Sequence, residues 1–199
     1  MTTKLEITLE YIKNLQIVRP KDLSKANLPQ MYLYRLLEKG EVKRLSRGLY
    51  EYVGREITEK TTIAEVCKMF PKAVVCLLTA LQFYDVTTQS PHKVWIALEN
   101  SAWRPDARKY PVRIVHMSGM SLTEGVITEK IEGVEVKIFN LAKTVADCFK
   151  FRNKVGLDVA LEALNEVRRR KLATSDELWK YAKICRVAKV MRPYMEAIQ

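Results

Sequence analysis

The sequence predicts an α+β fold, with an N-terminal winged helix-turn-helix followed by an α+β C-terminal domain that ends in a helical bundle. Three patterns predict this architecture. Near the N-terminus, stretches of helical hydrophobic spacing alternate with turn residues and lead into a short hairpin. Strand patterns dominate the middle of the chain. From Asn140 to the end of the chain, the pattern is helical.

The first three helices follow from hydrophobic spacing and from the Pro and Gly residues at their ends. Residues 3–14 carry apolar side chains mostly at helical spacing. Pro20 starts a short second helix, because Pro is favoured in the first helical turn. A turn at residues 27–29 separates this helix from a third one over residues 30–39, which Gly40 ends as a C-cap.

A two-stranded hairpin follows the third helix. Residues 42–47 and 49–53 have strand patterns on either side of a tight turn, where Gly48 supplies the positive φ that such turns need. Helix, helix, turn, helix and hairpin is the order of a winged helix, so residues 1–56 are predicted to form this DNA-binding domain.

The polar segment 54–60 is the predicted linker to a C-terminal domain over residues 61–199. Asn140 and Ser175 are predicted helix N-caps, and Gly133 lies at a predicted hairpin turn. The predicted helices are 61–70, 74–84, 141–152, 155–170, 174–185 and 187–198, and the predicted strands are 93–99, 112–117 and the hairpin 127–139.

The chain of 199 residues carries a net charge of +11, and the excess is concentrated near its C-terminus. Residues 150–192 hold 12 Lys and Arg against 5 Asp and Glu, whereas residues 1–60 hold 12 against 8. A basic excess attracts polyanions, although a solvated lysine-rich face has the same composition.

The sequence argues against several classes of protein. It has no run of about 18 apolar residues, and early charges break any secretory signal, so a cytoplasmic protein without membrane contact is expected. The four cysteines lack CxxC spacing and form no zinc cluster with the two histidines, so we expect buried reduced thiols, no metal and no cofactor. Since no GxSxG, P-loop or HExxH motif occurs, we do not expect an enzyme.

The third predicted helix carries the candidates for base recognition. Because Leu33, Leu36 and Leu37 share its apolar face, the remaining positions point outward. Gln pairs with adenine and Arg with guanine, while cations of the second helix and the hairpin suit phosphate or minor-groove contact. The alternative is a solvated edge hairpin. The predicted DNA-binding residues are Lys21, Lys25, Gln30, Met31, Tyr34, Arg35, Lys43, Arg44, Ser46 and Arg47.

Three segments resemble the AbiEi antitoxins, the antitoxin half of the AbiE abortive-infection toxin–antitoxin systems. They are RLSRGLY (44–50), LLTALQFYDVTTQSP (77–91) and the most specific one, AKTVADCFKFRNKVGLDVALEAL (142–164). The segments lie in the order of the family, and the resemblance covers nearly the whole chain.

The resemblance implies two functions. The winged helix would bind inverted repeats in the double-stranded DNA of its own operon promoter and act as a transcriptional autorepressor. The C-terminal domain would counter a toxin, AbiEii, which looks like a nucleotidyltransferase. Such systems are classed as type IV, in which antitoxin and toxin need not form a complex, and phage defence is the implied setting.

Charged residues of the predicted C-terminal helices are the candidates for the antitoxin surface. Lys143 and Asp147 lie off the apolar stripe of their helix, and at i,i+4 spacing they could equally form a simple salt bridge. The arginine run closes a helix, where cations also favour the negative end of the dipole. The candidate surface residues are Lys143, Asp147, Lys150, Arg152, Arg168, Arg169 and Arg170.

Two other functions fit the sequence. One is a plain winged-helix transcriptional regulator whose C-terminal domain senses a ligand or dimerises. The other is an RNA-directed binding or modifying protein that uses the basic C-terminal half. Rescue of cells from the neighbouring toxin distinguishes the antitoxin from both.

Overall fold

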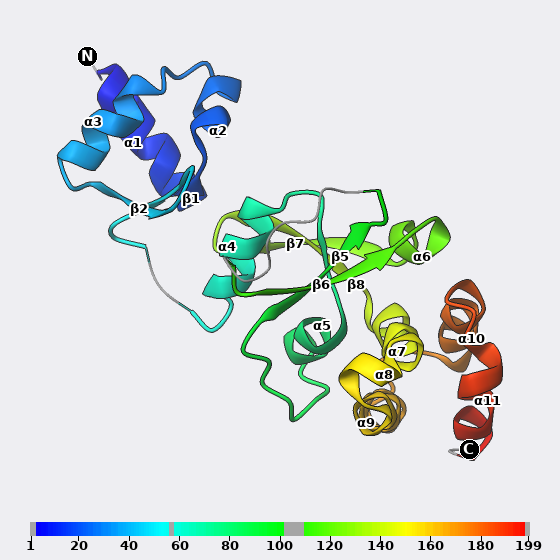
Figure 1. Ribbon diagram of the computed structural model, residues 1–199. Coiled ribbons are helices and arrows are strands. Elements are labelled where there is room, and N and C mark those ends of the chain that lie inside the picture. The colour runs from blue at the N-terminus through cyan, green and yellow to red at the C-terminus, as the bar shows by residue number, and fades with distance from the viewer. Residues whose placement is uncertain (1–2, 56–57, 102–109, 198–199) are drawn as a thin grey trace. The chain divides into compact units, whose positions relative to one another are not determined.

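The computed structural model describes residues 3–55, 58–101 and 110–197 (Figure 1). Eleven helices and two sheets occur among these residues, which confirms the predicted mixed α+β class. The chain forms two compact units, residues 1–71 with 130–136, and residues 72–129 with 137–199. The domain boundaries predicted at residues 56 and 61 stay a prediction.

The first unit contains helices around a small antiparallel sheet with strand order β1-β3-β2. The predicted helices and hairpin all occur. The strand β1 was not predicted, because its two residues are too few to show a period. The elements are α1 (Lys4–Leu15), β1 (Ile17–Val18), α2 (Pro20–Lys25), α3 (Met31–Glu38), β2 (Val42–Ser46), β3 (Leu49–Tyr52) and α4 (Thr61–Met69).

Local sequence signals set the ends of these elements. Thr3 and Glu6 form a capping box at the start of α1, in which each side chain bonds the other residue's backbone N–H. Gly40, with φ 73°, follows the last turn of α3, and Gly48, with φ 74°, lies in the β2–β3 turn. The core between helices and sheet contains the buried side chains of Ile12, Val18, Leu23, Leu33, Leu36, Val42 and Tyr50.

A buried arginine lies at the centre of a charged cluster in the first unit. The side chain of Arg55 is 2% exposed, and its guanidinium donates to Glu51 at 2.7 Å, Glu65 at 3.2 Å and Glu132 at 2.5 Å. Burial alone would raise the pKa of Glu132, but hydrogen bonds from Thr58, Arg55 and Thr61 outweigh it and hold this pKa below its usual value.

The second unit is built on a five-stranded mixed sheet with strand order β6-β5-β4-β8-β7. The pairs β5–β6 and β4–β8 are parallel, and β4–β5 is antiparallel. Trp95, Ala97, Val115 and Phe139 are among the sheet residues in the core. The elements are β4 (Val74–Val75), α5 (Leu77–Phe83), β5 (Val94–Glu99), β6 (Val112–Met117), α6 (Met120–Thr123), β7 (Val126–Ile131) and β8 (Val134–Phe139).

The helix predicted over residues 74–84 is partly wrong. Val74 and Val75 form β4 and pair with Ala97 and Ile96 of β5, and the helix α5 begins only after Cys76. Two adjacent β-branched residues favour the extended backbone, and a neighbouring strand supplies their hydrogen bonds. A short apolar run does not reveal such a switch from strand to helix.

Five helices follow the sheet: α7 (Leu141–Lys150), α8 (Arg152–Val155), α9 (Leu157–Arg169), α10 (Ser175–Ile184) and α11 (Ala188–Ala197). Asn140 caps α7 as predicted, since its side chain accepts the N–H of Lys143 at 2.9 Å. The predicted cap Ser175 is wrong. Thr174 caps α10, because it forms a capping box with Glu177 and leaves Ser175 as the first helical residue.

The helix α7 is enclosed on all sides, and nine of its ten residues are buried. It packs against α5, α9 and α10. All four cysteines are free and buried, and burial raises the pKa of Cys67 and of Cys185 to about 12. These thiols are therefore protonated and poorly reactive at neutral pH.

Lys143 and Asp147 form an ion pair inside this core and do not lie on the surface, which corrects their assignment to an antitoxin surface. Both side chains are 0% exposed, and Lys143 Nζ donates to Asp147 at 2.5 Å. The thiol of Cys185 donates to the other carboxylate oxygen at 3.2 Å, and Lys143 Nζ lies 4.1 Å from the Phe139 ring centroid. Burial raises the pKa of Asp147, and the charge and hydrogen bond of Lys143 oppose that rise.

Replacement of one partner of this ion pair should destabilise the second unit more than replacement of both partners. We expect Lys143→Met to lower the free energy of unfolding by about 3–5 kcal/mol, because Asp147 is left buried and unpaired. The double variant with Asp147→Leu should recover most of the loss. Trp95 and Trp179 belong to this unit, and the first unit contains no tryptophan, so denaturant unfolding followed by tryptophan fluorescence measures the second unit. Additive losses in the double variant would contradict the interpretation.

The lowered pKa of Glu132 predicts a pH-dependent contribution to stability. The contribution is full above its ordinary pKa of 4.5 and is lost as pH falls through the lower folded-state value. Glu132→Gln should therefore cost about 1–3 kcal/mol near neutral pH. The difference from wild type should shrink in acid, as measured by circular dichroism melts. The exposed Glu135→Gln is the matched control, and a pH-independent difference for Glu132→Gln would argue against this role.

Candidate nucleic-acid interface

The helix α3 presents an exposed face whose residues match the sequence prediction. Leu33 is 0% and Leu36 1% exposed, which fixes the rotation of the helix about its axis. On the other face, Met31 is 50% and Tyr34 46% exposed, and Arg35 is exposed as well. These exposed side chains lie together on one face of a helix whose other face is buried, so this face is a candidate contact surface.

Neighbouring groups hold three of the candidate side chains of α3. Gln30, at the N-cap, donates from Nε2 to Ser24 Oγ on α2 at 2.8 Å. Tyr34 packs edge-on against Tyr50 of β3, with ring centroids 6.4 Å apart. The Arg35 guanidinium lies 5.7 Å from the centroid of Tyr32. These contacts restrict the side chains before any ligand binds, which lowers the entropy lost on binding.

The β2–β3 hairpin and α2 carry the remaining candidates. Lys43 Nζ forms a salt bridge with Glu51 at 2.8 Å, and Arg44 Nε donates to the carbonyl of Ser46 at 3.2 Å. Arg47 is exposed at the hairpin turn, and it forms no hydrogen bond or salt bridge within the part of the chain that the structure describes. The same holds for the exposed Lys21 and Lys25 of α2.

Glu51 is not among the predicted residues, and it pairs with Lys43 as well as with Arg55. Lys43 and Glu51 are direct cross-strand partners in the β2–β3 register. Opposite charges at such positions stabilise a hairpin, so the alternation of residues around the turn was the signal that could have found the pair. Lys43 is thus more restricted than Arg47 as a candidate phosphate ligand.

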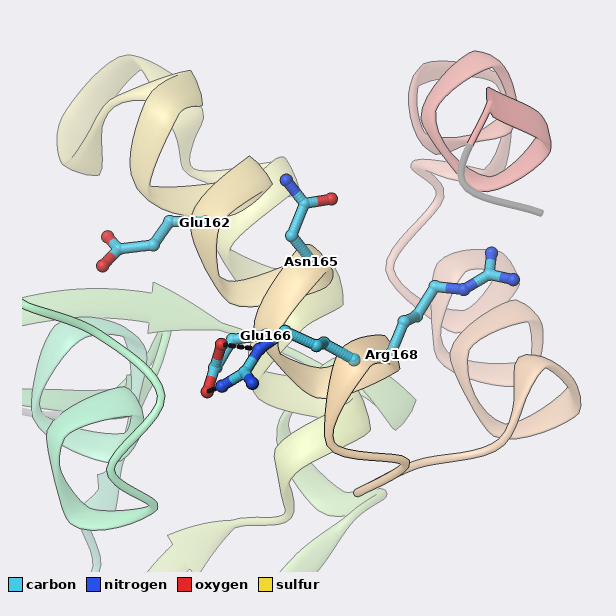
Figure 2. Close-up of a pocket in the computed structure, with 5 residues that line it drawn as sticks. Glu162, Asn165, Glu166 and Arg168 are labelled. Atoms are coloured by element: carbon cyan, nitrogen blue, oxygen red, sulfur yellow. Dashed lines mark hydrogen bonds and ion pairs between the residues drawn. The ribbon is translucent and has the colours of Figure 1, made fainter.

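The arginine run at the end of α9 is paired within the second unit. Arg169 donates to Glu166 through two hydrogen bonds, and Figure 2 shows Glu166 and Arg168 on this helix. Arg168 donates to the carbonyl of Met195 at 2.8 Å, and Arg170 donates to the carbonyl of Asp85 at 2.6 Å. The hydrogen bond from Arg169 lowers the pKa of Glu166. A hollow of about 620 Å³ beside this run is lined by Glu162, Asn165, Glu166, Arg168 and Arg169.

The last two candidates for an antitoxin surface are also bonded within the fold. Lys150 Nζ donates to Ser121 Oγ at 3.2 Å, and Arg152 donates to the carbonyl of Phe149 at 2.9 Å. Both side chains are half-buried. The seven candidates therefore divide into the buried pair Lys143–Asp147 and a set of cations whose donors serve neighbouring carbonyl, carboxylate or hydroxyl groups.

The segment from α1 to β3 is similar in sequence to a known protein family. Residues 6–53 match a protein family described as "Transcriptional regulator, AbiEi antitoxin". The resemblance to the AbiEi antitoxins is thus confirmed over these residues, and it supports regulation of transcription and antitoxin function as the general kind of activity. No curated protein matches the sequence significantly.

One solved structure is similar to almost the whole chain. The crystal structure of the RV2827C protein from Mycobacterium tuberculosis has a TM-score of 0.58 at 10% sequence identity, and the match covers 98% of this chain and 80% of that one. At this identity the likeness concerns the fold alone. No helix in the described parts of the chain is long and apolar enough to cross a bilayer.

Proposed function

We propose that the chain is an AbiEi-type antitoxin that represses its own operon through a winged helix-turn-helix. In this proposal α3 is the recognition helix, and the β2–β3 hairpin is the wing. The observation that carries it is the two-sided α3, with Leu33 and Leu36 in the core and Met31, Tyr34 and Arg35 exposed, inside the segment that matches the family.

Base recognition would come from the exposed face of α3. Gln30 and Arg35 have the donors and acceptors to pair with adenine and guanine, and Tyr34 can reach a phosphate or a thymine methyl. Met31 adds an apolar surface beside them. Two copies of the chain on an inverted repeat would each place one α3 in the major groove, because a palindromic site mirrors a two-fold arrangement of its readers.

Phosphate contacts would position the helix in the groove. Lys21 and Lys25 lie on α2, which precedes the recognition helix, and Arg44 and Arg47 lie on the proposed wing. Such contacts set register and affinity without reading sequence. Of the two arginines on the proposed wing, Arg47 is better placed to contact a phosphate, since no internal partner in the described residues holds its guanidinium.

The second unit would carry the antitoxin function against an AbiEii toxin, in a type IV system for phage defence without a required toxin complex. The support is the resemblance of segment 142–164 to the family. That segment includes nearly all of α7, where nine of ten residues are buried, so its sequence specifies a fold. The neutralising activity would then come from exposed residues elsewhere on the unit.

Arg35→Ala and Arg47→Ala should weaken binding to the operon's own promoter for different reasons. Removal of a guanine contact at Arg35 should cost about 1–3 kcal/mol and relax specificity at one position. Removal of a phosphate contact at Arg47 should lower the salt slope of log K by about 1 without a change in sequence preference. Gel shifts and anisotropy titrations measure both. Arg169→Ala, on the second unit, is the control, and equal effects of all three variants would refute the assignment.

The two functions should separate in cells. The full-length double variant Arg35→Ala/Arg47→Ala should lose repression of a promoter fusion but still rescue growth when the neighbouring toxin is expressed. Loss of both activities would contradict separate functions for the two units. Repression without rescue by the wild-type chain would instead identify a plain transcriptional regulator.

A further inference from the structure

Five cations recur at every third position near the end of the chain. This cation row consists of Lys180, Lys183, Arg186, Lys189 and Arg192. Asp and Glu are absent between Leu178 and Met195. Lys180 and Lys183 lie on α10, Lys189 and Arg192 lie on α11, and Arg186 lies in the turn between the two helices.

The row is exposed and its charges are not neutralised by neighbouring acids of the described chain. All five side chains are exposed, and within the described residues none forms a salt bridge. Lys180 contacts the Tyr181 ring, at 5.3 Å from its centroid. The nearest acid along the chain, Glu177, accepts from the N–H and hydroxyl of Thr174, and after those bonds the charge of Lys180 also lowers its pKa, without a salt bridge between the two. The row therefore differs from the arginine run of α9, whose donors serve internal carbonyls and carboxylates.

The buried faces of α10 and α11 hold the cation row in place. Leu178, Tyr181 and Ala182 of α10 and Met191 and Met195 of α11 are buried in the core. In Figure 1, α10 and α11 lie on the side of α7 away from the five-stranded sheet. Because each helix is anchored by its apolar side, the cations on its other side face solvent.

The turn between α10 and α11 places Arg186 in a conformation that usually belongs to glycine. The N–H of Val187 bonds the carbonyl of Ala182, and the N–H of Arg186 bonds the carbonyl of Lys183, which defines a Schellman motif. Arg186 has φ 61°, where a side chain is unfavourable. Lys171 occupies the same position after α9, with φ 54°. Arg186 and Lys171 thus occupy equivalent positions, one inside the cation row and one outside it.

We propose that the cation row binds the sugar–phosphate backbone of single-stranded RNA. A row of cations without acids fits a polyanion of regular charge spacing. The row passes from α10 to α11 at Arg186. A flexible single strand can follow the bend between two helices. Duplex DNA is stiff, with a persistence length of about 150 base pairs, and does not bend so sharply. The aromatic side chains between residues 178 and 195 are buried or half-buried, so base stacking contributes little and binding is independent of sequence.

The substitution Arg186→Gly tests the row without damage to the fold. It removes the central cation and puts glycine where the Schellman motif favours it, so the melting temperature should not fall. Because one phosphate of the single strand is then no longer neutralised, affinity for a labelled oligouridylate of about 20 nucleotides should fall about fivefold at about 0.1 M salt. The salt slope of log K should decrease by about 0.7. The full-length protein is used throughout.

Lys171→Gly is the matched control, because it removes one charge and places glycine in the same motif at the end of α9. It should leave RNA affinity unchanged. Lys183→Ala/Lys189→Ala removes two cations of the row and should lower affinity about 25-fold. Oligoadenylate should bind like oligouridylate.

Three results would overturn the proposal. The first is an equal decrease in affinity for Lys171→Gly and Arg186→Gly, which would reflect net charge alone. The second is unchanged RNA affinity in Arg186→Gly. The third is a stronger effect of Arg186→Gly on promoter or non-operator duplex DNA than on RNA, which would assign the row to DNA. Promoter binding through the first unit should otherwise remain as in wild type, so a failure here is separable from a failure of the proposed repressor function.

Discussion

Complete burial of α7 is the constraint on which the second unit depends. A helix without a solvated face must satisfy its polar side chains internally, because unpaired charge in a core costs several kcal/mol. Asp147 therefore needs both Lys143 on its own helix and the thiol of Cys185 after α10. Asn140, which caps α7, donates to the hydroxyl of Tyr181 on α10. These bonds fix where α10 ends, and with it the turn to α11.

Pairing with acids inside the fold decides which cations remain available for a ligand. The chain holds 34 Lys and Arg, and their number says little about which of them are free. Arg169 is paired with Glu166, and Lys43 is paired with Glu51. The cation row of α10 and α11 and Arg47 of the hairpin have no such partners among the described residues. Affinity for a polyanion comes from charges that release counterions, and internally neutralised cations release few.

Much of the first unit was predictable because its signals are local. The apolar stripe of α3 identified which side chains point outward, and glycines after α3 and in the hairpin marked turns that need positive φ. The second unit was harder to predict, because the features that departed from the sequence pattern depend on tertiary contacts. Lys143 and Asp147 lie off an apolar stripe, and only the packing of other helices over that side converts them from surface to core. Val74 and Val75 became a strand because β5 lies beside them.

The residues that specify the fold of the second unit differ from those proposed for its function. The long segment that resembles the antitoxin family includes most of the buried α7, whose side chains specify packing. A solved structure with 10% identity shares the fold over almost the whole chain, so this architecture tolerates a change of residue at most positions. A property of this particular chain has to arise from exposed side chains that the core does not require. The cations of α10 and α11 meet that condition. Arg186 is one of them, because the turn between the two helices does not require its side chain.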